Sequence, residues 1–491
     1  MGRQEEIIKE RLKKLEALKK SGINPYPNKF NVKDYSIKLQ ERYKSLKKEK
    51  KSNAKAIVAG RLLTFRDLGK IAFGTLRDSS GEIQIMLQFP TTPKSLFQFF
   101  KKYIDSGDFL GIEGNIFRTK RGELSIIVKS VVLISKSILP LPEKFHGLKD
   151  EEERYRKRYL DLIANPEVSQ IFKKRAVILK TLRDFMEEKN FLEIETPILQ
   201  SVYGGALAKP FKTHIDAYDS DIFLSIAPEL PLKKALVGGL GNVYEITKKF
   251  RNEGVDRNHN PEHMTIEWYQ PYANYEDGMI LFKELIKQIS KNLFGSYKFE
   301  YQGKKIDVSK WTVLPIDKAI KKYLKVDVSK ILSDSDAKKI AENHKIPSDG
   351  ITKANIQDEL MKLFRDKLIQ PTFLIDYPIE SSPLAKPSSS NPEKAEVFQP
   401  FIAGLELARA YSELNDPKLQ EQHFKSQEQE RKSGNKEAMP TDKDFIVALQ
   451  HGMPPACGVG IGIERIVMLF TNQTSIRDVI LFPFMKPENS K

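Results

Sequence analysis

The sequence has a single cysteine, Cys457, among 491 residues. One cysteine excludes an intramolecular disulfide and is typical of a protein from a reducing compartment. Only His259 and His263 are closely spaced histidines, with a proline between them. The thiolate and imidazole clusters of structural zinc sites are therefore missing. Carboxylate oxygens remain as candidate metal ligands.

Long hydrophobic runs are also missing. The best membrane candidate, LSIIVKSVVLI from Leu124, contains Lys129 and is shorter than the ~20 residues that a membrane-spanning helix needs. The N-terminus is charged instead of apolar, so no secretory signal is expected. We expect a cytoplasmic protein without a membrane span.

Several nucleotide and hydrolase motifs do not occur. The sequence contains neither GxxxxGK[ST] nor GxSxG, which excludes a P-loop site and the nucleophile elbow of α/β-hydrolases. A Rossmann site needs G-x-G-x-x-G early in a βαβ unit with an acid ~20 residues later, and that pattern is absent as well.

The charge, in contrast, is large and uneven. Lys and Arg exceed Asp and Glu by 16, and more than half of that excess lies in residues 1–55. Ile8, Leu12, Leu15 and Leu18 recur there at helical spacing. Two interpretations stay open: a solvated amphipathic helix, or a basic arm that faces nucleic-acid phosphates.

The length and the 40% hydrophobic content predict a folded protein of more than one domain. After the basic extension 1–55, five strand-like runs over 56–140 predict a small β-barrel, for which an OB-fold fits best. A generic barrel without a ligand is the alternative. A linker over 141–160 precedes an α+β domain over 161–491, with a helical insertion at about 325–370.

Two segments of the second half indicate a phosphate-binding site. Arg251 leaves a strand-like run, and Glu253 follows on the same face, which suits a phosphate grip fixed by an ion pair. In GVGIGIERIVMLF, Gly458, Gly460 and Gly462 leave one strand face bare for a flat ligand, and Arg465 follows. A surface salt bridge is the alternative for the first segment.

Three acids follow runs that look ready for burial. These are Glu229 in SIAPEL, and Glu406 and Glu413 in AGLELARAYSELND. Buried carboxylates need cationic partners. The acids therefore indicate a divalent metal site, an ammonium-binding site or both, unless they are three separately paired surface acids.

The order of these segments resembles a known family. FLEIETPIL, KKFRNEGVDRNHNPEHMTIEWY and GVGIGIERIVMLF resemble motifs one, two and three of the class II aminoacyl-tRNA synthetases. With the N-terminal barrel they resemble the subgroup for lysine, aspartate or asparagine. GGALAKPF, SIAPELPLK, YPIESSPLAK and SELNDP are similar to its lysyl branch. The match covers about residues 57–487.

The resemblance implies a catalytic domain with an antiparallel sheet of six or seven strands flanked by helices, and a homodimer formed through motif one. It also implies activation of lysine with ATP, helped by Mg²⁺, followed by transfer to the 3′ end of tRNA(Lys). Arg251 and Arg465 are the implied catalytic residues. The other implied ATP-binding residues are Glu253, His259, Asn260, His263, Gly460 and Gly462.

For lysine the resemblance implies Gly205, Glu229, Glu267, Tyr269, Arg409, Tyr411 and Glu413, and for the metal Glu406 and Gln399. The sequence departs from the family at four of its site positions. Gln399 stands where the family has a metal-binding Glu, and Arg409 stands where it has an Asn. His263 takes the place of a Phe that stacks on adenine. Asn258 takes the place of a loop Arg, for which the adjacent Arg257 can compensate. In the barrel, Phe73 and Gln84 match anticodon-reading positions, with Arg61 and Glu123 as further candidates.

Three other functions stay open. One is a class II synthetase for a different amino acid, with Arg409 as the suspect residue. Another is a paralogue that transfers lysine to a protein, although such paralogues lack the barrel. The last is a non-catalytic tRNA-binding paralogue.

Overall fold

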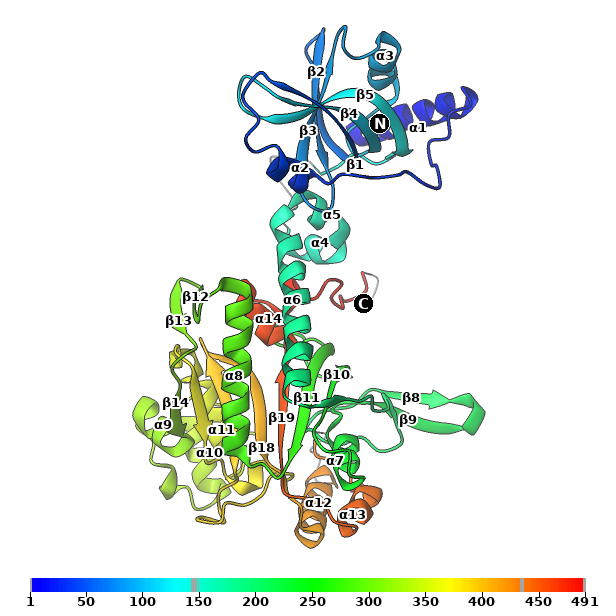
Figure 1. Cartoon of the computed structure of the whole chain (residues 1–491). Coiled ribbons are helices and arrows are strands. Elements are labelled where there is room, and N and C mark those ends of the chain that lie inside the picture. The colour runs from blue at the N-terminus through cyan, green and yellow to red at the C-terminus, as the bar shows by residue number, and fades with distance from the viewer. Residues whose placement is uncertain (1, 143–147, 149, 433–436, 489–491) are drawn as a thin grey trace. The chain divides into compact units, whose positions relative to one another are not determined.

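The computed structural model describes residues 2–142, 148, 150–432 and 437–488. They form two compact units, Met1–Lys149 and Asp150–Lys491, labelled by element in Figure 1. The boundary falls inside the predicted linker 141–160, whose second half is helical, with α4 (Glu151–Arg156) and α5 (Arg158–Ala164). Arg158 is 1% exposed and its Nη1 lies 2.7 Å from Asp161 Oδ2. Arg158 Nε and Nη2 also donate hydrogen bonds to the main-chain oxygens of Leu481 and Arg477, which makes the segment part of the second unit.

The first unit contains a closed barrel with strand order β1-β2-β3-β5-β4. Buried and outward-facing residues alternate along β2 and most of β1, as expected for a barrel filled by its own side chains. The predicted five-stranded barrel is confirmed, and the apolar stretch from Leu124 is strand β5. The elements are β1 (Lys51–Asp67), β2 (Ile71–Arg77), β3 (Glu82–Gln88), α3 (Lys94–Tyr103), β4 (Phe109–Arg118) and β5 (Leu124–Ser135).

The basic extension packs on the barrel. It contains α1 (Arg3–Lys20) and α2 (Ser36–Arg42), which bury Leu18 and Leu39 in the barrel's hydrophobic core. Arg11 is 7% exposed and donates hydrogen bonds to three main-chain carbonyls of the barrel unit. The amphipathic-helix interpretation is therefore correct for α1. Its outward side keeps exposed Lys9, Lys13, Lys19 and Lys20, so a phosphate-facing role is compatible with the packed helix.

The second unit is built on a nine-stranded sheet with the order β14-β15-β16-β18-β19-β11-β10-β6, in which β17 pairs with β16. The strands from β15 to β10 are antiparallel, but the edge pairs β14·β15 and β10·β6 are parallel. The resemblance implied an antiparallel sheet of six or seven strands. The observed sheet has nine strands and is mixed, because both of its edge pairs are parallel. The strands are β6 (Leu192–Glu193), β10 (Val243–Phe250), β11 (Glu262–Pro271), β14 (Thr312–Pro315), β15 (Thr372–Ile375), β16 (Val397–Ile402), β17 (Leu405–Glu406), β18 (Ala408–Ser412) and β19 (Ala456–Gly462).

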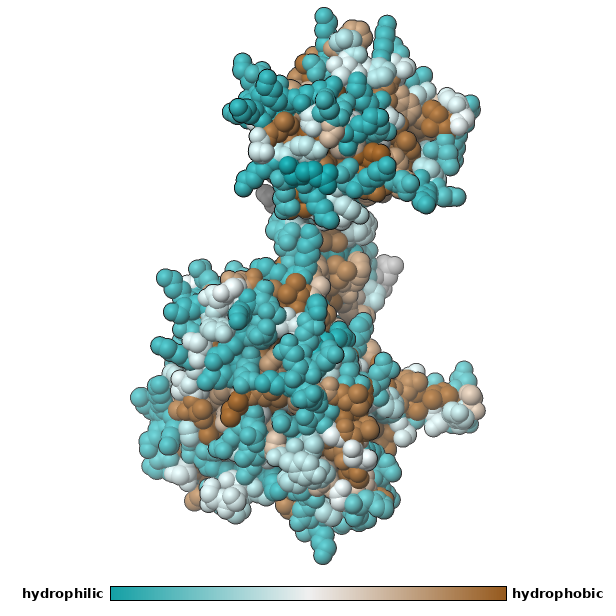
Figure 2. Space-filling view, viewed as in Figure 1, coloured by the Kyte–Doolittle hydropathy of each residue, from teal (hydrophilic) through white to brown (hydrophobic). Residues whose placement is uncertain are grey.

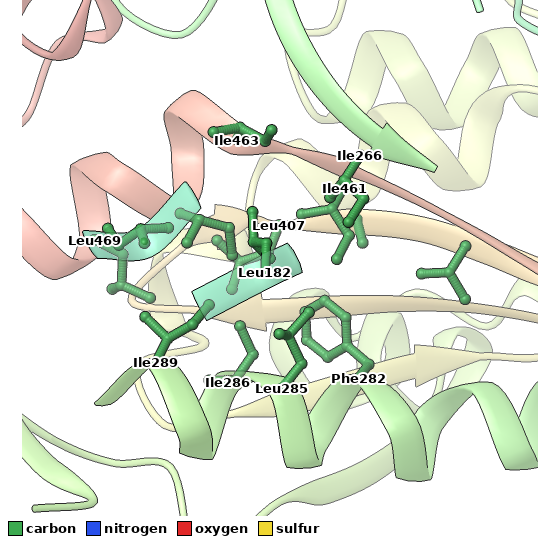
Figure 3. Close-up of a cluster of buried hydrophobic side chains, with 14 of the residues drawn as sticks. Leu182, Ile266, Phe282, Leu285, Ile286, Ile289, Leu407, Ile461, Ile463 and Leu469 are labelled. Carbon is green, nitrogen blue, oxygen red and sulfur yellow. The ribbon is translucent and has the colours of Figure 1, made fainter. Parts of the chain in front are cut away.

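Helices α6 (Pro166–Glu188), α8 (Tyr275–Phe294) and α14 (Ile463–Thr471) pack their apolar sides on the sheet. Figure 3 shows Phe282, Leu285 and Ile286 of α8 beside Ile266 and Ile461 of the sheet. Because side chains alternate along a strand, burying Ile266 and Ile461 on this face sends their neighbours Glu267 and Gly460 to the other. That second face carries the candidate site.

The remaining elements surround this frame. The helices are α7 (Glu229–Val237), α9 (Ile316–Leu324), α10 (Asp334–Asn343), α11 (Ile356–Lys362), α12 (Pro417–Lys432), α13 (Lys443–Gln450) and α15 (Ile476–Val479). The 3₁₀ turns are Asp216–Tyr218, Val328–Lys330, Arg365–Lys367 and Ile379–Ser381. The other strands are β7 (Leu199–Gln200), β8 (Lys212–Ile215), β9 (Ser220–Leu224), β12 (Lys298–Tyr301) and β13 (Lys304–Asp307). Helices α10 and α11 lie in the predicted helical insertion and share a separate hydrophobic core with α9 and with strands β15 and β16.

Candidate active site

A cavity of about 370 Å³ lies over β11, β17, β18 and β19, within the usual size of small-molecule sites. It gathers most of the predicted catalytic, ATP-binding and lysine-binding residues from five separate stretches of the chain. Those that line it are Gly205, Glu229, Arg251, Glu253, His259, Asn260, His263, Glu267, Tyr269, Glu406, Arg409, Tyr411, Gly460, Gly462 and Arg465. Glu413 and Gln399 do not line it.

The strand register explains how these residues meet. Arg409 of β18 pairs with Gly460 of β19, which pairs with Glu267 of β11. With strands ~4.8 Å apart, the bare Gly460 leaves a gap between a guanidinium and a carboxyl group. One step along the sheet, Gly458 leaves a second gap between Tyr411 and Tyr269.

The two glycines serve different purposes. A Cβ atom on Gly458 would overlap with Oε1 of Glu413 and the Tyr269 ring, so the packing of the protein itself requires glycine there. A Cβ atom on Gly460 would meet its nearest protein atom, Cγ of Glu267, at 3.4 Å, an ordinary contact. The missing side chain at Gly460 therefore leaves room for a ligand.

One end of the cavity is acidic. Glu229 begins α7, and its Oε1 accepts hydrogen bonds from Tyr411 Oη and Lys233 Nζ, both at 2.6 Å. Glu413, after β18, pairs through Oε2 with the same Lys233. Glu229 is 3% exposed, Glu413 1% and Lys233 0%. Two buried carboxylates thus share one buried ammonium group.

The other oxygen of Glu413 has no such partner. Its Oε1 is buried and accepts no hydrogen bond from any described residue, and it lies next to bare Gly458. Burial, followed by the nearby Glu229, raises the pKa of Glu413 despite the opposing effect of Lys233. An unpartnered buried acceptor of this kind binds a cationic donor strongly.

Glu267 is a third acid at this end. Burial raises its pKa to about 8, and Glu229 adds to the shift, whereas Lys249 and Arg251 oppose it. Lys249 Nζ donates to Ser225 Oγ at 3.1 Å, and burial lowers its pKa. Near neutral pH, Glu267 therefore holds a proton that an arriving cation displaces.

The other end is cationic, with three arginines held by main-chain carbonyls. Arg251 Nε lies 3.3 Å from the oxygen of Ile226, and Arg465 Nη1 lies 2.9 Å from that of Glu406. Arg409 Nη2 donates to the oxygen of Ser381 at 3.1 Å and to Ser382 Oγ at 2.9 Å. In the described part of the chain, Arg251 and Arg409 form no ion pair, and Arg465 approaches Glu406 only to 4.0 Å.

Neither Glu406 nor Glu413 forms an ion pair with Arg409 in the described part of the chain. Its guanidinium group lies 5.6 Å from the centre of the Tyr377 ring. Burial opposes its charge, but Asp358 and Tyr377 raise its pKa. It remains a cation that faces the cavity.

The loop after β10 and the first residues of β11 supply the remaining predicted ATP-binding residues. Burial, with Arg251 next, lowers the pKa of His263 to about 3, so this imidazole is neutral and suited to stacking. Burial raises the pKa of Glu253. His259 Nδ1 lies 2.8 Å from Asp256 Oδ2, and Asn260 Nδ2 donates to the oxygen of Glu262 at 2.6 Å.

The structure separates the two residues considered for the metal. Glu406 lines the cavity, but Gln399 is 2% exposed and accepts a hydrogen bond from Tyr377 Oη. No group of three Asp, Glu, His or Cys side chains gathers to hold a metal ion in the ranges described. Mg²⁺ needs only one or two carboxylates when substrate phosphates and water complete its shell. Glu406 therefore fits this role, and Gln399 does not because its side chain is used inside the protein.

The barrel places its candidates on more than one part of its surface. Phe73 and Gln84 belong to the outward-facing rows of β2 and β3, so Phe73 is not a core residue. Gln84 Oε1 accepts from Ser125 Oγ at 2.7 Å, and Glu123 is exposed two residues before Ser125. Arg61 is used elsewhere: its Nη1 donates to the oxygen of Gly107, and it lies 4.3 Å from the Phe109 ring centre.

Sequence reasoning missed Lys233, the serine pair Ser381 and Ser382, and Glu464. Glu464 lines the cavity and accepts from Arg175 Nη2 at 2.8 Å and from the Met264 amide at 3.0 Å. The only signal for Lys233 was its position four residues after Glu229, and that spacing normally marks a surface pair.

Known families match both units. Residues 150–486 match the model for tRNA synthetases class II (D, K and N). Residues 56–134 match the model for the OB-fold nucleic acid binding domain. The first match covers the sheet, the cavity and the helices around it.

Curated relatives match nearly the whole chain. A lysine–tRNA ligase of Pelotomaculum thermopropionicum is 44% identical over 497 residues, covering 99% of this chain and 96% of that protein. One of Moorella thermoacetica is 44% identical over 486 residues, covering 98% of each. One of Nostoc punctiforme is 43% identical over 500 residues, covering 99% of this chain and 89% of that protein.

Proposed function

The chain belongs to the class II tRNA synthetases (D, K and N), and we propose that it is the lysine–tRNA ligase of this family. It activates lysine with ATP to lysyl-adenylate and pyrophosphate, and then transfers lysine to the 3′ end of tRNA(Lys). The observation that carries this conclusion is the buried pair Glu229 and Glu413, with Glu413 Oε1 unpartnered at the acidic end of the cavity.

Lysine has two ammonium groups and one carboxylate, and the cavity offers a counterpart to each. The side-chain ammonium group pairs with Glu229 and Glu413, between Tyr269 and Tyr411. The α-ammonium group lies by Glu267 and Gly205. An aspartate side chain would need a cation at Glu229 and Glu413 instead, so the acids select against it.

Arg251 and Arg409 hold the α-carboxylate of lysine, and Arg251 and Arg465 hold the phosphates of ATP. Because these guanidinium groups are fixed by carbonyls, they stabilise charge on the α-phosphate without reorganising during the reaction. Positioning and charge stabilisation are the main requirements of the displacement, so no general base is assigned.

Adenine lies over the bare strand at Gly460 and Gly462, between His263 and Arg465, with Glu253 at its edge. His259 and Asn260 bind ATP from the loop after β10. Mg²⁺, when bound with ATP, supplies further positive charge to the phosphates, and Glu406 is its protein ligand.

Aminoacylation tests this function directly. Purified protein, ATP, Mg²⁺ and radiolabelled lysine are expected to charge tRNA(Lys) and not tRNA(Asp) or tRNA(Asn). Charging with a different amino acid would favour the synthetase of altered specificity, for which Arg409 in the cavity is the specific observation. No charging with any amino acid would favour the non-catalytic paralogue.

The anticodon-binding role of the barrel is part of this proposal. Phe73 stacks on a base and Gln84 binds a base edge, as in other single-strand readers; Glu123 and Arg61 are weaker candidates. Phe73→Ala is expected to lower kcat/KM for tRNA about tenfold and to leave tRNA-independent activation of lysine unchanged. Equal losses in both assays would remove Phe73 from this role.

We also propose a homodimer in the cytoplasm. The segment that resembles motif one exposes large apolar side chains: Val177, Leu192, Ile198 and Leu199. Figure 2 shows hydrophobic residues gathered near the base of the β8–β9 hairpin on this unit. No helix in the described ranges is long and apolar enough to cross a membrane. Sedimentation is expected to give twice the chain mass of 56.3 kDa, and Leu199→Asp is expected to shift it toward the monomer.

A further inference from the structure

Lys233 is a buried charge that the proposed reaction does not use. It lies one turn after Glu229 on α7 and is 0% exposed. Its Nζ lies 5.5 Å from the ring centre of Tyr411 and 5.9 Å from that of Phe445. It does not line the cavity. A lysine in such a place needs a reason, because burying an ammonium group costs free energy unless anions compensate it.

The contacts of Lys233 divide the oxygens of the two acids. Lys233 binds Oε1 of Glu229 at 2.6 Å and pairs with Oε2 of Glu413. In the described structure, no hydrogen bond engages Oε2 of Glu229 or Oε1 of Glu413. Each acid therefore turns one oxygen to Lys233 and keeps the other for a ligand.

The charges of Glu229, Glu413 and Lys233 do not cancel. When a bound ammonium group keeps both carboxylates ionised, two carboxylates and one internal ammonium group leave a net charge of minus one for it. Without Lys233, two carboxylates that share a site do not both stay ionised, because like charges in a buried place repel. A pair that holds one proton also carries a charge of minus one, but it presents an O–H donor where an acceptor oxygen is needed, so it must release that proton before both acids accept from a cation.

We propose that Lys233 is a positioning residue of the amino-acid pocket, an internal counterion that leaves Glu229 and Glu413 with one net negative charge and one free oxygen each for a single substrate ammonium group. The inference rests on the proposed function, since it assigns that group to lysine. It explains why a pocket for a cation contains a cation of its own. It also makes the acids reject neutral side chains of similar size, since both free oxygens would then stay unpaired.

The test compares lysine binding by calorimetry in wild type, Lys233→Met, Glu413→Gln and the double variant. Lys233→Met alone is expected to weaken lysine binding about tenfold or more and to leave ATP binding unchanged. In the Glu413→Gln background the same change is expected to strengthen lysine binding, because removing Lys233 restores the net charge of minus one. A purely structural lysine would weaken binding in both backgrounds, and that result would overturn the inference.

The pH profile gives a second readout. The titratable groups around Lys233 and its two acids are Tyr411 on β18, Glu267 and Tyr269 on β11, and Cys457 on β19. These groups are shared by wild type and variant, so the ratio of the two lysine affinities isolates Lys233. The ratio of wild-type affinity to Lys233→Met affinity is expected to fall toward one as the pH rises, because the carboxylate pair of the variant then loses its proton. A ratio independent of pH contradicts the inference.

Lys234→Met is the matched control. Lys234 is the next residue on α7, lies at the surface and pairs with Asp444 at 2.6 Å; its removal is expected to leave lysine binding unchanged. Thermal melting shows whether each variant is folded. If the wild type itself does not bind lysine, the proposed function fails and this inference with it. If the wild type binds lysine and Lys233→Met has no effect, only the inference fails.

Discussion

The two ends of the cavity hold their charged groups in opposite ways. At the acidic end, Glu229 and Glu413 are almost fully buried and are held by another side chain, Lys233. At the cationic end, Arg251, Arg409 and Arg465 are held by main-chain carbonyls. A carbonyl orients a guanidinium group without neutralising it, whereas Lys233 cancels one of the two negative charges of Glu229 and Glu413.

The ligands of the proposed function account for this difference. A triphosphate carries several negative charges, so arginines that keep their full charge suit it. A lysine side chain carries one positive charge, and two uncompensated carboxylates in a buried pocket would exceed it. At the cationic end, main-chain carbonyls hold the arginines and leave their charge intact. At the acidic end, the ion pair with Lys233 lowers the net charge.

Breaking the cationic end is expected to have the largest effect. Arg251→Gln removes a fixed donor near the reacting phosphate and is expected to lower kcat of lysine-dependent ATP–pyrophosphate exchange about 10³-fold. Lys248→Gln is the control, because Lys248 lies near the end of β10, three residues before Arg251, but is exposed and pairs with Glu262. Similar losses in both variants would show that charge near β10, and not the position of Arg251, matters.

Breaking the acidic end is expected to affect one substrate only. Glu413→Gln removes the charge of the carboxylate whose Oε1 is unpartnered, and we expect KM for lysine to rise about 100-fold with KM for ATP nearly unchanged. Glu421→Gln on α12 is the control, since Glu421 forms an exposed pair with Lys425. Equal increases of both KM values would mean that Glu413 supports the whole cavity and not lysine alone.

The two glycines of β19 sharpen the comparison between packing and ligand space. Gly458→Ala forces an overlap with Glu413 and Tyr269, and we expect it to lower the free energy of unfolding by about 1–3 kcal/mol. Gly460→Ala meets only an ordinary contact and is expected to weaken ligand binding without changing the melting temperature. A large loss of stability in Gly460→Ala would contradict a ligand role for that gap.

The smallest expected effect is a dependence on pH. Burial raises the pKa of Glu267 to about 8 in the free protein, and a bound α-ammonium group favours its ionised form. Lysine binding therefore releases a proton below that pKa, and lysine affinity is expected to rise about fivefold between pH 7 and 8. Calorimetry in two buffers of different ionisation enthalpy measures the released proton, and Glu267→Gln is expected to abolish it.

The sequence predicted the acids of the cavity but not how they are compensated. Glu229 and Glu413 were recognisable because each follows an apolar run, and a buried acid needs a cation. Lys233 was not, since a lysine four residues after a glutamate usually lies on a helix surface. Edge strand β6 was also missed, because its two residues are too few to give a periodic pattern in the sequence.

The glycine pattern of β19 was informative only in part. Its alternation predicted one bare face, and the register places that face between Arg409 and Glu267. Packing requires a glycine at position 458 but not at position 460, because Glu413 lies beside Gly458. The spacing of the glycines in the sequence does not reveal the position of Glu413. Likewise, the hydrogen bond from Tyr377 that occupies Gln399 joins residues that are 22 positions apart in the sequence.

Amino-acid-dependent ATP–pyrophosphate exchange with the wild-type protein tests the central claim most directly, because it requires both ends of the cavity at once and needs no tRNA. All twenty amino acids are compared at equal concentration. The account predicts strong stimulation by lysine and little by any other. Stimulation by a different amino acid, with none by lysine, would contradict the assignment of the acidic end.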